Sequence, residues 1–183
     1  MFIFGHIGIT LGIVFIVSHL VPRIRNKANY GFVAFGAILP DLVDKTTGRV
    51  ILADSVANGR IFAHTLFFVF ILVLLTLCLY KYRYEYALFS GCVASAAFLH
   101  LLEDRMWNMP QTLFWPLYGW DFPKGVNCDN WFTLFFFMFK NTYIPDISYA
   151  FVSEVIGLGI VLVFVCGAIL QRKYKLAFLI KLS

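Results

Sequence analysis

The feature that most constrains this chain is a series of long apolar runs that contain almost no charge. Residues 1–20 and 61–80 hold no Asp, Glu, Lys or Arg. Twenty helical residues rise about 30 Å, which matches the hydrocarbon core of a bilayer. Segments 86–102 and 147–170 are predicted to span as well, whereas segment 30–39 is short and is predicted to end at Pro40. These runs therefore predict five membrane helices, of which the second is short.

The overall composition agrees with this interpretation. Of the 183 residues, 61% are hydrophobic and 14% are charged, against about 45–50% and about 25% in ordinary soluble domains. A soluble globular protein, a disordered chain and a disulfide-stapled secreted domain are excluded. Because lipid offers backbone groups no hydrogen-bond partner, we predict an all-α polytopic bundle that forms one integral-membrane domain over residues 1–183.

The basic residues predict the orientation of this bundle. Nine of them follow the first, third and fifth spans, together with a single acid, Glu85. The positive-inside rule places this side in the cytoplasm, so the N-terminus is predicted outside and the C-terminus inside. The basic tail 171–183 is predicted to lie on the inner leaflet. Topology thus accounts for the net charge of +5, and a nucleic-acid partner is not indicated. The nine residues are Arg23, Arg25, Lys27, Lys81, Arg83, Arg172, Lys173, Lys175 and Lys181.

The main segment on the predicted outer side is the loop 103–146, which contains all four tryptophans. Tryptophan favours the membrane–water interface, so an aromatic belt is the simplest interpretation. Within the loop, residues 131–139 read W-F-T-L-F-F-F-M-F, an apolar run too short to span. We predict an interfacial or re-entrant helix that lies over the outer face.

Most ionisable residues of the predicted spans fall at one membrane level, near the outer ends of four helices. His100 and Asp104 are four residues apart and share a helical face. Asp41 and Asp44 are three apart and share a face if the helix continues past Pro40. Because the second helix is predicted to be short, Asp41 is expected below the outer surface, in a water-filled notch. The full set is His6, Asp41, Asp44, His64, His100 and Asp104.

Polar residues at this depth are costly and indicate a site. Imidazole and carboxylate together suit a divalent ion, with zinc as the first choice and manganese or iron as alternatives. One or two ions are compatible with these six predicted metal ligands. A bound ion would lower the pKa of a water molecule towards about 7 and supply a nucleophile. The competing interpretation is that single histidines at helix ends are interfacial residues without a ligand.

Two further residues are predicted to act in the site. Arg60 precedes His64 by four residues and is predicted to share its helical face, either as an interface anchor or as a donor to an anionic oxygen. Glu154 lies about two turns inside the fifth span, where an acid is expected to be a general base, a ligand or a partner of one. For Glu103 we expect a solvated or supporting role.

Four stretches of the chain form a set of short motifs. They read G-A-I-L-P-D-L-V-D-K at 36–45, G-R-I-F-A-H-T at 59–65, H-L-L-E-D-R-M-W at 100–107 and L-F-W-P-L at 113–117. Together with the early His6 they resemble the YdjM-like family of membrane-bound, metal-dependent hydrolases, and they cover roughly residues 1–120 in the family's order. Two departures are that Asp44 stands one position later than the second acid of many members, and that Gly59 replaces a histidine.

The resemblance implies a metal-dependent hydrolase, and the depth of the site implies a lipid or lipid-linked substrate. We predict hydrolysis of a phosphoester or another ester at the outer leaflet, with Arg60 stabilising negative charge. The alternative is a metal or proton transporter, or a membrane protein with a structural metal site. A transporter needs polar groups across the whole bilayer, and the inner half offers few: Thr10, Ser18, His19 and Thr76.

Overall fold

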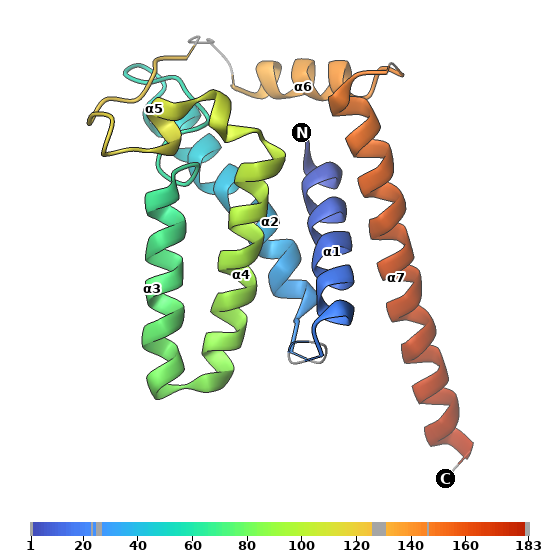
Figure 1. Cartoon of the computed structure of the whole chain (residues 1–183). Coiled ribbons are helices and arrows are strands. Elements are labelled where there is room, and N and C mark those ends of the chain that lie inside the picture. The colour runs from blue at the N-terminus through green and yellow to red at the C-terminus, as the bar shows by residue number, and fades with distance from the viewer. Residues whose placement is uncertain (1, 23, 25–26, 126–130, 146, 182–183) are drawn as a thin grey trace.

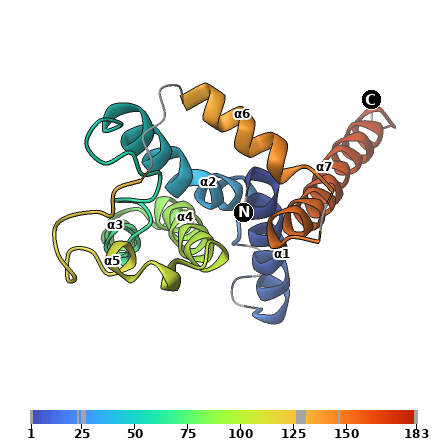
Figure 2. The ribbon, with the colours of Figure 1, turned by 90° about the horizontal axis from the view of Figure 1, so that it is seen from above.

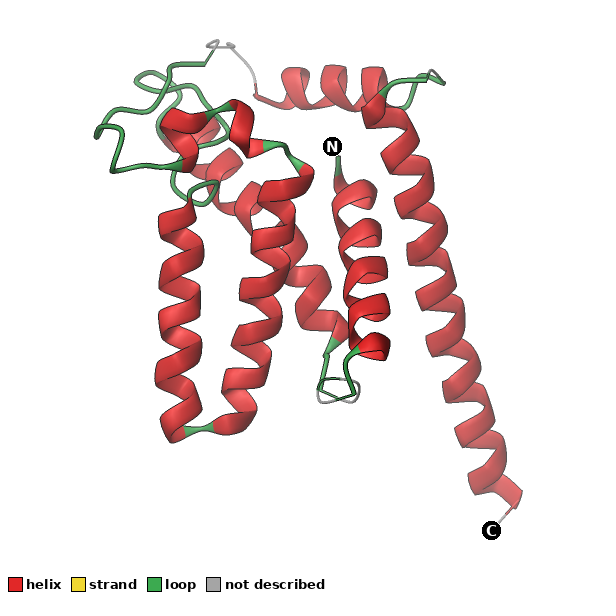
Figure 3. Cartoon of the chain, in the orientation of Figure 1, coloured by secondary structure: helices red, strands yellow, loops and turns green. Residues whose placement is uncertain are grey.

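The computed structural model describes residues 2–22, 24, 27–125, 131–145 and 147–181, and every regular element within them is helical (Figures 1 and 3). The all-α prediction is confirmed. Arg23 and Arg25, used above for orientation, and residues 182–183 of the predicted tail lie outside the described residues. The helices are α1 (Ile3–Leu20), α2 (Tyr30–Thr46), α3 (Leu66–Tyr82), α4 (Tyr84–Glu103), α5 (Pro110–Leu113), α6 (Trp131–Thr142) and α7 (Tyr149–Lys181).

Five helices form the bundle, and they pack in the order α3, α4, α2, α1 and α7 (Figures 1 and 2). The pair α3–α4 is a helical hairpin joined at Arg83, and α2 packs between α4 and α1. At one end of the bundle, α6 lies across the top of Figure 1, close to the start of α1. This matches the prediction of a short helix that covers one face.

The bundle has the surface of a membrane protein. Helix α1, helix α4 and the part of α7 from Tyr149 to Arg172 are long and apolar enough to cross a bilayer, and α3 is a shorter apolar helix. Large apolar side chains point outward along them, among them Ile16, Leu77 and Val163 at 58%, 61% and 71% exposure. Water would solvate such a continuous apolar surface poorly, whereas lipid solvates it without cost.

Helix α2 is longer than the sequence predicts. It was expected to end at Pro40, but it runs on to Thr46 and continues as a π-helical turn, Thr47–Ile51. Proline removes one helical hydrogen bond and crowds the preceding turn. Two sets of contacts outweigh this cost. Within α2, Asp41 pairs with Lys45 one turn later, and Asp44 makes tertiary contacts with the segment before α3. The argument that a ten-residue helix places Asp41 below the surface therefore fails.

Helix α3 begins later than predicted. The apolar run 61–80 suggested a helix from residue 61, but α3 starts at Leu66, with Thr65 as its N-cap accepting a hydrogen bond from the Phe68 N–H at 3.0 Å. Residues 61–64 instead turn so that three of their N–H groups point at Asp44. His64 and Arg60 therefore lie in a loop, and the prediction that they share a helical face is wrong.

Helices α1 and α7 approach very closely at a pair of glycines. A Cβ atom on Gly8 would lie 2.0 Å from the Gly157 carbonyl oxygen, and one on Gly157 would lie 2.1 Å from the Phe4 carbonyl oxygen. No side chain fits at either position without separating the two helices. Small residues that allow such backbone approach are a common basis of helix association in membranes.

We expect Gly8→Ala and Gly157→Ala each to lower the free energy of unfolding by roughly 1–3 kcal/mol, the usual cost of overpacking. The measurement is denaturant unfolding in detergent micelles. Gly167→Ala is the matched control, because a Cβ atom there meets no described atom within 4 Å. Equal stability of Gly8→Ala and Gly167→Ala would contradict the close approach.

Candidate metal centre

Four elements bring ionisable side chains together at the end of the bundle that α6 covers. His6 comes from the first turns of α1, Asp41 from α2, and His64 from the loop before α3. His100 comes from the last turn of α4, and Asp104 follows that helix directly. All three histidines are at most 1% exposed. Four separated segments thus place five of the six predicted ligands in one buried cluster.

Each histidine is held through its Nδ1 atom. His6 Nδ1 donates to Glu103 Oε2 at 2.8 Å, His64 Nδ1 donates to Asp44 Oδ2 at 2.7 Å, and His100 Nδ1 donates to the Ala37 carbonyl oxygen at 2.7 Å. An imidazole that donates through Nδ1 presents the lone pair of Nε2 on its other side. Metal-binding histidines in proteins are usually oriented in this way.

The Nε2 atoms of His64 and His100 lie close together, and those of His6 and His64 lie close to the two carboxylates. His100 Nε2 lies 3.2 Å from His64 Nε2. His64 Nε2 lies 3.6 Å from Asp41 Oδ1 and 3.7 Å from Asp104 Oδ2, and His6 Nε2 lies 3.3 Å from Asp104 Oδ1. His6 Nε2 is buried and forms no hydrogen bond with any described atom. The centre of the cluster is therefore a group of acceptor atoms.

Two groups of three residues within this cluster have the spacing of metal ligands. One comprises His6, His100 and Asp104, and the other comprises Asp41, His64 and His100. His100 belongs to both groups. The five residues are called the ligand cluster below.

Asp44 lies behind His64 rather than inside the ligand cluster. Its carboxylate is fully buried and accepts four hydrogen bonds, from the backbone N–H groups of Ile61, Ala63 and His64 and from the His64 ring. The distances are 2.7–3.0 Å. With its oxygens used in this way, Asp44 orients the loop and the His64 imidazole.

Glu154 is also separate from the ligand cluster. Its carboxylate accepts the N–H groups of Phe2, Phe4 and Gly5 at 2.7, 3.0 and 2.9 Å and the Tyr143 hydroxyl at 2.7 Å. These N–H groups belong to the start of α1, which no local side chain caps. A carboxylate at a helix N-terminus satisfies free donors and matches the positive end of the helix dipole. Burial and the neighbouring Glu154 charge raise the pKa of Tyr143.

Arg60 contacts the ligand cluster from outside. Its Nε and Nη2 atoms both donate to Asp104 Oδ2 at 2.8 Å, and its side chain remains 40% exposed. Burial alone would raise the pKa of the Asp104 carboxyl. The nearby His6 ring and the Arg60 guanidinium outweigh burial, so the pKa lies below its ordinary value. Asp104 is therefore ionised, as a carboxylate that binds a metal must be.

The family comparison decides where the chain belongs. The family described as YdjM inner membrane protein matches residues 1–177. This chain is a member of the YdjM family. The match extends beyond the residues 1–120 that carry the motifs and includes most of α7, with Glu154. No curated protein and no solved structure matches the chain.

In this YdjM family member, the motifs account for the ligand cluster but not for its supports. Glu103 is buried and links the His6 ring to the Thr10 hydroxyl, which donates to it at 2.8 Å. Of the two roles expected for Glu103, the supporting one fits this placement. Thr10 and Lys45 were not singled out from the sequence. The available signal is their spacing, because Thr10 follows His6 by four residues and Lys45 follows Asp41 by four.

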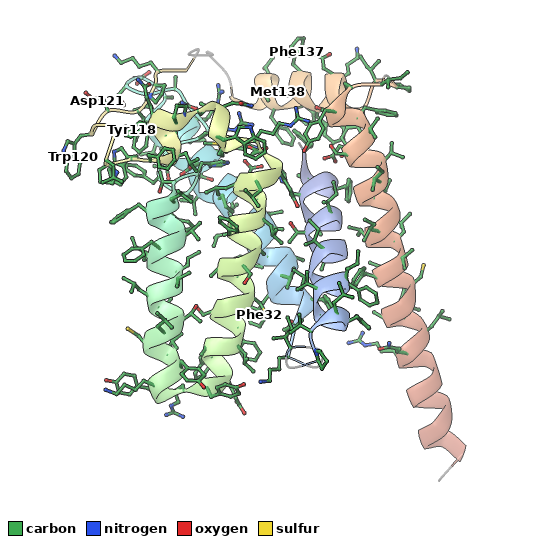
Figure 4. The ribbon with its side chains drawn as sticks, viewed as in Figure 1. Phe32, Tyr118, Trp120, Asp121, Phe137 and Met138 are labelled. Atoms are coloured by element: carbon green, nitrogen blue, oxygen red, sulfur yellow. The ribbon has the colours of Figure 1, made fainter. Side chains whose placement is uncertain are left out.

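Aromatic side chains of the predicted outer loop lie at the same end of the bundle. Trp115 packs against Phe62, Trp120 and Phe122, with ring centroids 5.3–5.7 Å apart. Figure 4 shows Tyr118 and Trp120 at the outer edge of this loop, where they are 64% and 76% exposed. On α6, Phe137 is 63% exposed and lies on the side away from the bundle (Figure 4).

Proposed function

We propose that this protein is a membrane-embedded, metal-dependent hydrolase that cleaves a phosphoester or another ester of a lipid or lipid-linked substrate. The observation that carries the proposal is the convergence of three imidazole Nε2 atoms and the carboxylates of Asp41 and Asp104 in one buried cluster. Lone pairs and carboxylate charges at 3.2–3.7 Å in a buried place are unfavourable unless a proton or a metal ion lies between them. Imidazole and carboxylate ligands are the combination that zinc, manganese and iron bind.

The residues that would hold the ion are His6, Asp41, His64, His100 and Asp104. Bonds of about 2.0–2.2 Å to one ion keep its ligands within about 4.4 Å of each other. The pairs of atoms whose distances are given above meet this limit, and they fall into two groups of three that share His100. His100 donates through Nδ1, so its Nε2 lone pair serves one ion. We therefore favour a single ion with zinc as the first choice. When bound, it would supply Lewis acidity and an activated water.

The remaining residues have distinct roles in this proposal. Asp44, Glu103 and the Ala37 carbonyl fix the orientation of the three imidazoles. Arg60 has a side chain that is 40% exposed and donates to Asp104, and its role in this proposal is to stabilise negative charge on a substrate oxygen. Glu154 holds the start of α1 in place, and α1 carries His6.

The orientation proposed is N-terminus outside and C-terminus in the cytoplasm. Under it, the ligand cluster lies at the outer end of the bundle, where the aromatic outer loop and α6 gather. Exposed aromatic and apolar side chains at that level favour a substrate that approaches from lipid.

Metal analysis of the purified protein tests the proposal. We expect about one zinc, manganese or iron ion per wild-type chain and a loss of most of it in His64→Ala, His100→Ala and the nearly isosteric Asp41→Asn. His19→Ala is the matched control, because His19 is exposed near the opposite end of α1 and bonds only within α1. Equal, near-zero metal in all samples would mean that protons rather than an ion neutralise these carboxylates.

Turnover distinguishes the hydrolase from the transporter. Metal-loaded wild-type protein in micelles is expected to release phosphate or alcohol from lipid phosphoesters, and His64→Ala is expected to lose this activity. Proteoliposomes provide the opposing measurement. Ion flux that depends on His6 and proceeds without hydrolysis would favour a transporter. Bound metal with neither flux nor turnover would favour a structural metal site.

A further inference from the structure

Helices α1 and α7 enclose a groove on the side of their glycine contact that faces away from the ligand cluster. The two backbones touch at Gly8 and Gly157, whereas a Cβ atom on Gly159 or Gly167 would meet no described atom within 4 Å. Towards the C-terminus, α7 leans away from the bundle (Figure 1). The resulting cavity of about 1030 Å³ is called the α1–α7 groove below. Its walls include Leu11, Ile16, Gly31, Ile160, Val163 and Ala168.

The α1–α7 groove lies in the part of the bundle that lipid surrounds. It is lined by α1 within residues 11–16 and by α7 within residues 156–171. Both stretches belong to the helices that can cross a bilayer, Ile3–Leu20 and Tyr149–Arg172. The α7 stretch is about 22 Å long at about 1.5 Å per residue, and one leaflet contributes about 15 Å of hydrocarbon. The groove is therefore long enough for the hydrocarbon chains of a lipid from one leaflet.

The interior of the groove is apolar. Of the described residues that line it, only Tyr30 and Gln171 have polar side chains. The Tyr30 hydroxyl is hydrogen-bonded to Ser18 Oγ at 3.2 Å, and its ring packs against Phe164 with centroids 5.1 Å apart. Phe15 packs on the other side of the Phe164 ring at 5.8 Å. Water enters a cavity only where several polar groups can bind it, so the groove favours hydrocarbon over water.

Positive charge lies at the end of the groove that is farthest from the glycine pair. Gln171 lines this end, and the chain continues R-K-Y-K at 172–175. The Arg172 side chain is exposed. His19 lies at the same end of α1, where its ring is 4.1 Å from that of the lining residue Phe15. Basic residues at the end of a membrane span attract anionic lipid headgroups.

We propose that the α1–α7 groove binds the hydrocarbon chains of one phospholipid whose anionic headgroup lies beside Arg172. This lipid belongs to the leaflet at the end of the bundle opposite the ligand cluster, which is cytoplasmic in the proposed orientation. The glycine pair closes the groove towards the ligand cluster, so the lipid is a resident ligand and not the substrate of that cluster. Empty, the groove would leave its apolar walls without contacting atoms. The inference does not depend on the proposed hydrolase activity.

Native mass spectrometry in uncharged detergent tests the groove with two probes, palmitoyl-oleoyl phosphatidylglycerol and palmitoyl-oleoyl phosphatidylcholine. Gly159→Leu and Gly167→Leu each place a side chain in the groove, where a Cβ atom meets open space. Leucine also favours a helix more than glycine does. We expect each variant to weaken binding of both lipids at least tenfold. Leu162→Phe is the matched control, because it adds bulk at an exposed position of α7 outside the groove.

Arg172→Gln tests the headgroup. Wild-type protein is expected to bind phosphatidylglycerol more tightly than phosphatidylcholine, because only the former has a net negative charge. Arg172→Gln should weaken phosphatidylglycerol binding about fivefold, the usual contribution of one basic residue at a membrane surface, and leave phosphatidylcholine binding unchanged. Lys81→Gln, in the last turn of α3, is the control for the loss of a basic residue elsewhere.

Three results would overturn the inference. The first is equal lipid affinity of wild type, Gly159→Leu and Gly167→Leu. The second is a wild-type dimer that becomes a monomer in these variants, since a second copy would then occupy the groove. The third is equal affinity of wild type for the two lipids, which would remove the anionic headgroup.

Two further measurements on every sample keep the interpretation clear. Denaturant unfolding separates loss of lipid from loss of fold, and two filled positions on different turns of α7 give independent readings. Metal content separates this inference from the proposed function. A metal-free wild type would count against the hydrolase and leave the lipid measurement intact, whereas normal metal content without lipid binding would count against the groove alone.

Discussion

Replacing Asp44 with alanine is expected to disrupt both the loop before α3 and the orientation of His64. In this variant, four N–H donors lose the Asp44 carboxylate that accepts them all, and Asp44 is fully buried. A buried donor without an acceptor costs about 1–3 kcal/mol. Because several donors lose their acceptor together, we expect a loss of about 3–5 kcal/mol in the free energy of unfolding.

Asp44→Asn separates the orienting role from a ligand role. The asparagine keeps one acceptor oxygen but cannot accept all four donors, so His64 loses its fixed orientation. Changes of this kind typically weaken metal binding about 10–100-fold. We expect Asp44→Asn to fall in this range and Asp41→Asn to lose more. Chelator competition on both variants provides the measurement. A complete loss of metal in Asp44→Asn, equal to that in Asp41→Asn, would make Asp44 a ligand.

Replacing Glu154 with alanine is expected to release the start of α1. The carboxylate is 1% exposed and accepts three backbone N–H groups and the Tyr143 hydroxyl. No local side chain caps α1, so its first donors would face a cavity without a partner. We expect the free energy of unfolding to fall by roughly 3–5 kcal/mol, because several buried donors lose their shared acceptor, at about 1–3 kcal/mol for each donor left without a partner.

A graded series tests this explanation by denaturant unfolding in micelles. Glu154→Gln keeps one acceptor oxygen and should lose less stability than Glu154→Ala. Tyr143→Phe removes a single hydrogen bond and should cost about 0.5–1.5 kcal/mol. Val163→Ala, at an exposed position of α7, is the control. Glu154→Gln should also retain its metal. Metal loss without loss of stability would instead make Glu154 part of the ligand cluster.

The long helices could be predicted from the sequence because they depend mainly on a local property, apolar length. Helix α4 was predicted as 86–102 and is Tyr84–Glu103, and the start of α7 was predicted within two residues. The basic tail was treated as a separate segment, but α7 continues to Lys181. Basic residues do not stop a helix, since Lys and Arg have high intrinsic helix propensities.

The two errors in helix boundaries have one common cause. The end of α2 and the start of α3 are both set by Asp44, whose carboxylate supports α2 beyond Pro40 and draws residues 61–64 out of a helix. Seventeen or more residues separate these partners in the chain. A hydropathy pattern reports only the residues within one run, so it cannot contain such a contact.

The candidate site shows the same limit. Five ionisable residues lie near helix ends at one predicted membrane level, and on that basis they were predicted to converge. The structure brings them together: His6, Asp41, His64, His100 and Asp104. Asp44 and Glu154 carry the same functional group and lie at similar depth. Their direction depends on which donors surround them, namely loop N–H groups for Asp44 and the start of α1 for Glu154. Residue type and depth identify a candidate ligand, whereas the neighbouring donors decide its role.

The support of α1 by Glu154 has a consequence for biosynthesis. Glu154 lies 149 positions after Gly5, one of the residues that it caps. The ribosome therefore completes α1 to α6 before the acceptor for the first turn of α1 emerges. Until α7 inserts beside α1, the first turn of α1 lacks its acceptor, and Glu103 is left to position His6. Under the proposed function, uptake of the metal would therefore be completed only after the last helix has inserted.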